Sequence, residues 1–132
     1  MDRISHSFLE HSGILAFAHR GDQDSGPENT MAAFEGAARL GFQYIETDVH
    51  ATSDGVLLAF HDPILDRLTD QRGRIDRLEW SSLRHVRVAG TEPIARLEEI
   101  LGEFPDLRVN IEPKSDVAVE LLINVIRRTG AE

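Results

Sequence analysis

Short apolar runs typical of β-strands alternate with longer segments of helical spacing, and this alternation predicts an α/β fold. The four predicted strands are Ile14–Ala18, Phe42–Val49, Val56–Phe60 and Leu107–Glu112. Each strand is followed by a helical or irregular segment, so we expect parallel strands joined by right-handed crossovers. The chain has 132 residues, which is the size of a single domain.

Helices are indicated by apolar spacing and by residues suited to helix ends. The predicted helices are Met31–Leu40, preceded by the capping segment Pro27–Thr30, then Arg96–Phe104 and Val117–Arg128, with a short one around Trp80–His85. Gly41 suits the C-terminal end of the first helix. Segment 64–93 contains scattered glycines and is predicted to be mostly irregular.

Composition excludes several classes of function. Lys and Arg number 14 against 23 Asp and Glu, a net charge of −9, which argues against a nucleic-acid partner and against binding to an anionic membrane surface. There is no cysteine, so thiolate zinc sites and cysteine nucleophiles are excluded. Met1–Gly13 lacks the pattern of a signal peptide, and no early apolar run is long enough to span a membrane. We therefore expect a soluble, cytoplasmic protein without integral membrane association.

Each predicted strand delivers ionisable side chains at its C-terminal end. These are His19 after the first strand, Glu46 and Asp48 in the second, His61 after the third, and Glu112 and Lys114 at the fourth. Residues two apart in a strand share a face, so Glu46 and Asp48 point the same way, as do Glu112 and Lys114. Sites in parallel α/β folds are built at these strand ends. Because all four predicted strands carry ionisable side chains at their C-terminal ends, we expect these side chains to form a single functional site.

The residue types in this site indicate the chemistry. Three carboxylates without a thiolate favour one hard cation, Ca²⁺ or Mg²⁺ with Mn²⁺ also possible, over zinc. Two histidines without a serine or cysteine nucleophile favour a general acid and a general base. Arg20 and Lys114 supply positive charge for an anionic substrate oxygen. Together these groups suit hydrolysis at phosphorus.

Other polar residues are interpreted as structural. Glu28 and Asn29 are expected to begin a helix, and Asp62 to cap the turn before Pro63. His50 and His85 are interpreted as surface or loop histidines. The arginines of the irregular segment are interpreted as a solvated loop rather than a binding patch; they are Arg67, Arg72, Arg74 and Arg77.

Six motifs in this order and spacing resemble the glycerophosphodiester phosphodiesterase family. They are His19-Arg20-Gly21, Pro27-Glu28-Asn29-Thr30, Ile45-Glu46-Thr47-Asp48-Val49, Thr52-Ser53-Asp54-Gly55, His61-Asp62 and Ile111-Glu112-Pro113-Lys114. Arg67-Leu68-Thr69 and Leu97-Glu98-Glu99 fit weaker parts of the pattern. The resemblance extends from about Leu15 to Lys114, which is most of the chain.

The resemblance implies a TIM-type (β/α) barrel, with segment 64–93 as the family's insertion after the third strand. It implies metal-dependent hydrolysis of glycerophosphodiesters to glycerol 3-phosphate and an alcohol. In the implied site, Glu46, Asp48 and Glu112 bind one divalent cation, His19 and His61 form the acid/base pair, and Arg20 and Lys114 hold phosphate oxygens. The implied partner is a small-molecule diester substrate.

The sequence departs from the family in two respects. Pro113 stands where an aliphatic residue is usual, so we expect a local adjustment with Glu112 still pointing inward. A complete barrel takes about 250 residues, so this chain holds only about the first four βα units, a half barrel with open sheet edges. The open half could be covered by a second copy in a homo-oligomer. The alternative functions are a truncated, inactive metal-binding half-barrel module and a related phospholipase C/D-like phosphodiesterase.

Overall fold

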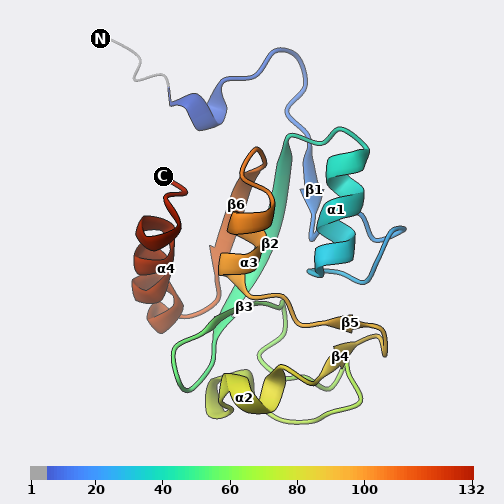
Figure 1. Ribbon diagram of the computed structural model, residues 1–132, viewed down its shortest axis with the longest axis vertical. Helices are drawn as coiled ribbons and strands as arrows, with labels where there is room; N and C mark the ends of the chain where they lie inside the picture. The colour runs from blue at the N-terminus through green and yellow to red at the C-terminus, as the bar shows by residue number, and fades with distance from the viewer. Residues whose placement is uncertain (1–5) are drawn as a thin grey trace.

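The computed structural model describes residues 6–132 and shows one four-stranded sheet built around a long central strand (Figure 1). The central strand is β2 (Tyr44–Ala51), and its neighbours are β1 (Phe17–His19), β3 (Leu57–Ala59) and β6 (Arg108–Pro113). The N-terminal segment Met1–Gly13 was predicted to lack a signal peptide, and its residues 1–5 lie outside the described part. The α/β class predicted from the sequence is confirmed by this arrangement.

Two neighbours of β2 run parallel to it. The register pairs Phe17 with Tyr44 and His19 with Glu46 on one side. On the other side, β6 pairs along its whole length, so that Asp48 lies opposite Glu112. Because all three strands run in the same direction, their C-terminal ends point toward the same end of the sheet.

The prediction that all four strands run parallel is wrong for β3. This strand is antiparallel to β2, with Val49 opposite Ala59 and Ala51 opposite Leu57. A parallel pair needs a crossover of about a dozen residues, whereas only segment 52–56 joins these two strands. The four-stranded sheet therefore contains three parallel strands, β1, β2 and β6, and one antiparallel hairpin strand, β3.

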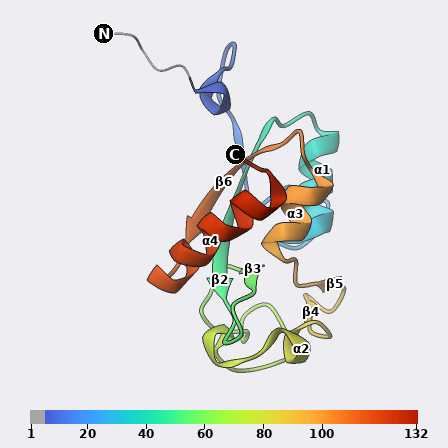
Figure 2. The same cartoon turned by 60° about the vertical axis from the view of Figure 1, so that its left-hand side comes forward.

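Three helices cover one face of the sheet (Figures 1 and 2). They are α1 (Met31–Arg39), α3 (Leu97–Glu103) and α4 (Asp116–Thr129), and α3 lies between the other two. Capping side chains begin two of them, since Thr30 accepts a hydrogen bond from the Ala33 amide and Ser115 accepts one from the Ala118 amide. The predicted helix boundaries agree with these within about two residues.

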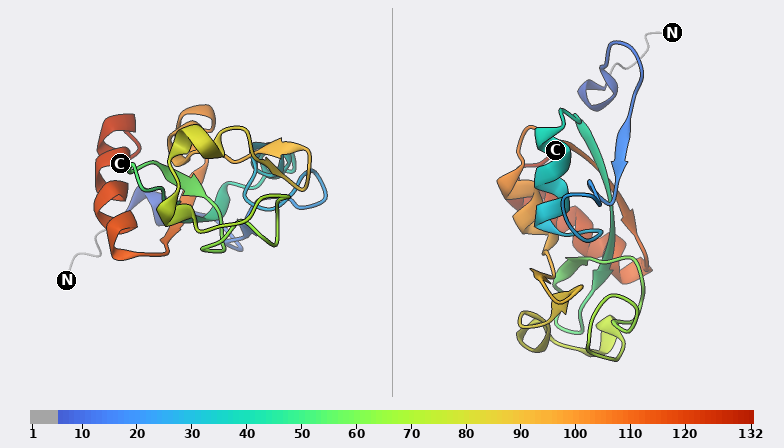
Figure 3. Two further views of the ribbon diagram at one scale, coloured as in Figure 1. Left: turned by 90° about the horizontal axis from the view of Figure 1, so that it is seen from below. Right: turned by 90° about the vertical axis from the view of Figure 1, so that its right-hand side faces the viewer.

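Alternation along β2 separates the core from the site. Ile45, Val49 and Ala51 belong to the two apolar clusters that hold the helices against the sheet. Glu46 and Asp48 lie between them in sequence, so their side chains leave the sheet on the opposite face. Figure 3 shows α1 and α3 on the helical side, with β1 toward the other side. We call the face that carries Glu46 and Asp48 the inner face.

Segment 64–93 is more ordered than the sequence predicts. It contains the 3₁₀-helix η2 (Ile75–Arg77), the short helix α2 (Trp80–Leu83) and a hairpin of β4 (Arg87–Val88) and β5 (Glu92–Pro93). It has an apolar cluster of its own, which includes buried Leu65, Ile75, Leu83, Val86 and Val88 and joins Leu58 and Phe60 of the β3 region. These apolar residues are spread over turns and short elements, so no long periodic pattern in the sequence indicates that they form a cluster. The interpretation of this segment as a family insertion stays a prediction.

The N-terminal segment lies at the opposite end of the molecule from segment 64–93 (Figure 1). Its 3₁₀-helix η1 (Ser7–Leu9) places the Phe8 ring edge-on to Tyr44 at 5.4 Å. The Tyr44 hydroxyl and the Arg108 guanidinium both donate to the Phe8 carbonyl. These contacts cover the inner face where β2 and β6 begin. Among the described helices, none is long and apolar enough to cross a membrane.

Candidate functional site

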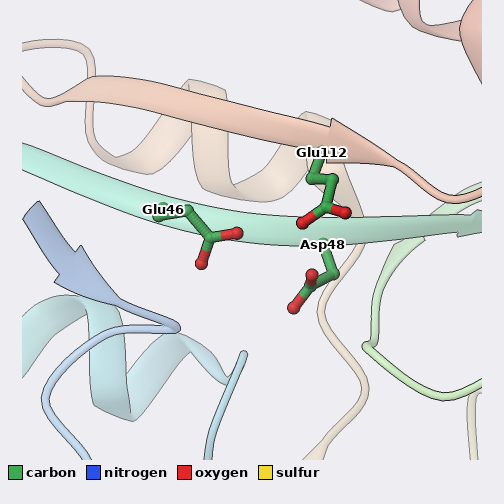
Figure 4. Close-up of side chains that lie close together, drawn as sticks. All are labelled: Glu46, Asp48 and Glu112. Atoms are coloured by element: carbon green, nitrogen blue, oxygen red, sulfur yellow. The ribbon is translucent and has the colours of Figure 1, made fainter.

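Three carboxylates converge at the C-terminal end of the inner face (Figure 4). Glu46 and Asp48 come from β2 and Glu112 from β6, and one oxygen of each lies within 4.8 Å of the others. The parallel register produces this cluster, because it sets Asp48 directly beside Glu112 and leaves Glu46 one pleat away. The three predicted metal ligands are therefore brought together. Glu112 points inward as expected.

The cluster concentrates negative charge in a partly buried place. Burial raises the pKa of Glu46, and the nearby charge of Asp48 raises it further. Burial acts in the same direction on Asp48, whose side chain is 1% exposed. Hydrogen bonds from Asn29 and Lys114, together with the charges of Lys114 and Arg20, outweigh burial and lower the pKa of Asp48 overall. Asp48 is thus held as an anion, whereas the ion-pair partner of Glu46 among residues 6–132 is His19, whose Nε2 lies 3.7 Å from Oε2.

The donor set of the cluster fits a hard divalent cation. All three side chains offer oxygen, which Ca²⁺ and Mg²⁺ prefer. Within the described residues, Glu46 Oε2 is buried and accepts no hydrogen bond. A buried anionic oxygen without a donor is costly, and a bound cation would satisfy it. The residues present therefore fit the predicted cation.

Both predicted phosphate-binding residues contact the cluster. Arg20 Nε lies 3.1 Å from Asp48 Oδ2. Lys114 Nζ lies 3.2 Å from Asp48 Oδ1 and 3.0 Å from Glu112 Oε1. Burial would lower the pKa of Lys114, but hydrogen bonds to Glu112 and Asp48 raise it overall. Both side chains are thus cations at the edge of the carboxylate cluster.

Pro113 is accommodated without loss of a sheet hydrogen bond. The Lys114 amide donates to the Val49 carbonyl at 3.0 Å. In an extended strand, the preceding residue directs its nitrogen to the other side, and β6 has no partner strand there among the described residues. The missing N–H of Pro113 therefore removes no sheet hydrogen bond, and β6 keeps the register that places Glu112 opposite Asp48.

The two predicted histidines reach the site from different sides. His19 is the last residue of β1, and its Nε2 lies 3.7 Å from Glu46 Oε2. His61 follows the hairpin strand β3, where the Phe60 amide donates to the Asp48 carbonyl at 3.0 Å. Because β2 continues past the cluster to Ala51 before the chain turns back, the antiparallel strand also ends beside the cluster. The strand direction was predicted wrongly, but His61 still lies near this end.

The sequence interpretation missed the role of Asn29. Its side chain is buried, and Nδ2 donates to Asp48 Oδ2 at 3.1 Å while Oδ1 accepts from the Thr47 hydroxyl at 2.8 Å. The backbone of Asn29 is left-handed, with φ of 58°, a conformation that asparagine tolerates better than most residues. The Pro-Glu-Asn-Thr motif was the signal that could have singled it out.

His50 was also misjudged, because it lies inside β2 and is half-buried rather than on a loop. Its Nε2 lies 2.8 Å from the His61 carbonyl oxygen. Burial lowers the pKa of His50. The ring therefore holds the backbone of His61 in place. The alternating faces of β2 put His50 on the side of Asp48, and that parity was readable in the sequence.

Three residues interpreted as structural form ion pairs beside the site. Glu28 lies between two guanidinium groups, 3.3 Å from Arg20 Nη1 and 2.6 Å from Arg67 Nη2. Asp62 accepts from Arg67 and lies 2.8 Å from His61 Nδ1. The pair of Glu28 with Arg67 joins residues 39 apart in the sequence, so no local pattern indicates it.

Comparison with known proteins agrees with this geometry. The glycerophosphoryl diester phosphodiesterase family matches residues 19–129. A curated protein of Mycobacterium tuberculosis named probable glycerophosphodiester phosphodiesterase 2 is 46% identical over 125 residues, which are 94% of this chain and 47% of that protein. Glycerophosphodiester phosphodiesterase 1 of Rattus norvegicus is 38% identical over 96 residues, 73% of this chain and 27% of that protein.

Solved structures show the same half-length match. A glycerophosphodiester phosphodiesterase from Agrobacterium tumefaciens superposes with a TM-score of 0.80 at 31% identity, over 87% of this chain and 53% of that one. An Oleispira antarctica phosphodiesterase in complex with the product sn-glycerol-3-phosphate gives 0.75 at 26% identity, over 86% of this chain and 51% of that one.

The chain thus spans about half the length, or less, of the relatives it matches. The predicted fold class, a TIM-type barrel of which this chain has a half, is confirmed by these structures. The matched region contains all seven predicted site residues. The chain therefore belongs to the glycerophosphoryl diester phosphodiesterase family.

Proposed function

We propose that this chain carries the metal and acid/base site for hydrolysis of glycerophosphodiesters to glycerol 3-phosphate and an alcohol. The observation that carries the proposal is the carboxylate cluster of Glu46, Asp48 and Glu112, flanked by His19 and by the two cations Arg20 and Lys114. The related Oleispira antarctica enzyme, in complex with sn-glycerol-3-phosphate, supports a small glycerophosphate ligand.

Glu46, Asp48 and Glu112 would hold one divalent cation, Ca²⁺ or Mg²⁺, with Mn²⁺ as a further candidate. A hard cation supplies charge stabilisation to phosphate oxygens and lowers the pKa of a bound hydroxyl. The side chain of Asp48 is fixed for this role by Asn29, which donates to one of its oxygens. Glu46 offers the buried oxygen that accepts no hydrogen bond in the described residues.

His19 and His61 are proposed as the acid/base pair. In the proposed reaction the glycerol 2-hydroxyl attacks phosphorus, a new P–O bond forms and the bond to the alcohol breaks. One histidine takes the hydroxyl proton and the other protonates the leaving alcohol. Water then opens the cyclic phosphate to glycerol 3-phosphate. Imidazoles suit both transfers because they exchange protons near neutral pH.

Arg20 and Lys114 are proposed to bind the phosphate oxygens. Both have charged atoms at the cluster, 3.1 and 3.2 Å from the oxygens of Asp48. An arriving phosphate would compete with Asp48 for these donors. Charge-assisted hydrogen bonds to a phosphoryl group strengthen as negative charge develops on it, which favours the transition state.

The test is release of glycerol 3-phosphate from glycerophosphocholine with Ca²⁺, with Mg²⁺ and with a chelator, in the wild type and in His19→Ala. We expect turnover that requires a cation and falls by at least 10²-fold in His19→Ala. Glu120→Gln is the control, since this exposed side chain lies on α4 outside the site. Turnover in chelator equal to that with cation would contradict the metal assignment.

One alternative is favoured by a specific observation. The match covers only 47% of the M. tuberculosis relative, so about half of that relative has no matched residues among these 132. On this alternative the chain is an inactive metal-binding half-barrel module. A folded protein that binds the cation without hydrolysing the diester would favour the module, and association into dimers would favour a second copy covering the inner face. Activity on intact phospholipid but not on glycerophosphocholine would favour a phospholipase C/D-like enzyme.

A further inference from the structure

A continuous chain of charged side chains joins His61 to Asp48. His61 Nδ1 lies 2.8 Å from Asp62 Oδ1, and Asp62 in turn accepts from Arg67. Arg67 also donates to Glu28, which pairs with Arg20, and Arg20 contacts Asp48. Arg67 is the central member of this chain. Within residues 6–132, its hydrogen bonds and ion pairs go to Asp62 and Glu28 and to none of the seven proposed site residues, yet these two partners contact His61 and Arg20.

Arg67 holds Asp62 with a fork of two donors and reaches Glu28 with one of the same nitrogens. Nε donates to Asp62 Oδ2 at 2.9 Å, and Nη2 donates to Asp62 Oδ1 at 3.0 Å. Nη2 also donates to Glu28 Oε1 at 2.6 Å. A planar guanidinium fixes the plane of a carboxylate that it grips at both oxygens, whereas an ammonium group grips a single point. The orientation of Asp62 therefore depends on an arginine.

The backbone that carries Arg67 is anchored. Leu65 is buried in the apolar cluster of segment 64–93, and the Thr69 amide and hydroxyl both donate to its carbonyl. On the other side of Arg67, the Leu68 carbonyl accepts from the Ala89 amide at 2.7 Å. A side chain on such a turn starts from a fixed position, so holding it in one place costs less conformational entropy than on a free loop.

Asp62 controls which nitrogen of His61 can exchange a proton. An ionised carboxylate that accepts from Nδ1 favours the tautomer with hydrogen on that nitrogen, and it leaves Nε2 for proton transfer. The hydrogen bonds from Arg67 hold the pKa of Asp62 well below its ordinary range, so this carboxylate is ionised at neutral pH. Arg67 thus has two branches of contacts, one through Asp62 to His61 and one through Glu28. On the second branch, Glu28 pairs with Arg20 beside the carboxylate cluster.

We infer that Arg67 is a positioning residue, which orients the His61 ring through Asp62 and the Arg20 guanidinium through Glu28. This inference deepens the proposed phosphodiesterase function and rests on it for the roles of His61 and Arg20. Segment 64–93, which lies outside the parallel strands, then contributes directly to the order of the site. This role gives a physical reason for the arginine of the Arg67-Leu68-Thr69 motif, whereas a solvated loop would not require that residue.

The first experiment reads the His61 ring without substrate or cation. Long-range ¹H–¹⁵N spectra of the imidazole distinguish a proton on Nδ1 from one on Nε2. We expect the Nδ1–H tautomer to dominate in the wild type and to lose its dominance in Arg67→Met. Arg74→Met is the matched control, because Arg74 lies in the same segment, has similar exposure, 47% against 49%, and forks its own acid, Asp76. Its spectrum should match that of the wild type.

The second experiment measures turnover of glycerophosphocholine. We expect kcat/KM to fall by about 10- to 100-fold in Arg67→Met and to be unchanged in Arg74→Met. Asp62→Asn and the double variant Asp62→Asn/Arg67→Met separate the two branches. If Arg67 acts on kcat through Asp62, the double variant should lose little more kcat than Asp62→Asn alone. Should Arg67→Met not fold, Arg67→Lys, which keeps the charge but loses the fork, takes its place in both experiments.

The outcomes separate this inference from the proposed function. An unchanged His61 tautomer in a folded Arg67→Met variant overturns the inference, whether or not the wild type is active. A changed tautomer supports it even where the wild type hydrolyses nothing, in which case the proposed function fails alone. Active wild-type protein with undiminished kcat/KM in Arg67→Met overturns the positioning role.

Discussion

At the scale of single residues, Asn29 shows how a site can depend on a side chain that does no chemistry. It donates to Asp48, accepts from Thr47 and adopts a left-handed backbone. We expect Asn29→Ala to cost about 2–4 kcal/mol, since it strains the backbone and leaves buried polar groups unpaired. Asn29→Gly should recover about 1 kcal/mol of this, because glycine removes only the strain. Urea denaturation of both variants measures the difference, and equal losses would contradict the strain argument.

The ion pair of Asp62 makes a second prediction at this scale, one that depends on pH. A carboxyl with a lowered pKa in the folded state binds its proton more readily when unfolded, so it stabilises the fold above its unfolded pKa of about 3.9. This stability is lost as the pH falls through that value and below. We therefore expect the wild type to exceed Asp62→Asn in free energy of unfolding at pH 6, and the gap to narrow steadily as the pH falls below about 4. Denaturation in chelator at several pH values tests this, and a gap that widens on acidification would refute it.

At the scale of elements, the β2–β3 hairpin decides where His61 lies. Its turn is held by Thr52, whose hydroxyl accepts from the Val56 amide, and by Gly55 with φ of 82°. We expect Gly55→Ala to cost about 1–2 kcal/mol through the left-handed backbone, since an added Cβ would meet only Leu121 at ordinary contact distance. Gly102→Ala in helix α3 is the matched control and should stabilise by up to about 1 kcal/mol, because space is open there and alanine favours helix. Thermal unfolding of the pair checks both signs.

At the scale of the whole molecule, local patterns predicted the positions of the elements and all three carboxylates. Apolar runs located the strands, and their alternating faces placed Glu46 beside Asp48. The direction of β3 was missed because the crossover rule was applied where the Asp54–Gly55 turn already required a hairpin. Asn29, His50 and Arg67 were missed for another reason. Their roles arise from contacts with Asp48, His61 and Glu28, which only the folded chain brings close. Strand parity indicates the face of β2 that carries His50, but not its contact with the His61 carbonyl.

The carboxylate cluster also links the site to the stability of the whole fold. Its carboxylates come from two strands, so a cation that binds them only in the folded chain should stabilise it by RT ln(1 + [L]/Kd), about 2.7 kcal/mol at 100 times Kd. We expect Ca²⁺ or Mg²⁺ to raise the melting temperature and a chelator to reverse the rise. Glu46→Gln should weaken or abolish the shift, whereas Glu120→Gln on α4 should keep it. A shift that survives in Glu46→Gln would place the cation elsewhere, since Glu46 holds the buried oxygen that accepts no hydrogen bond in the described residues.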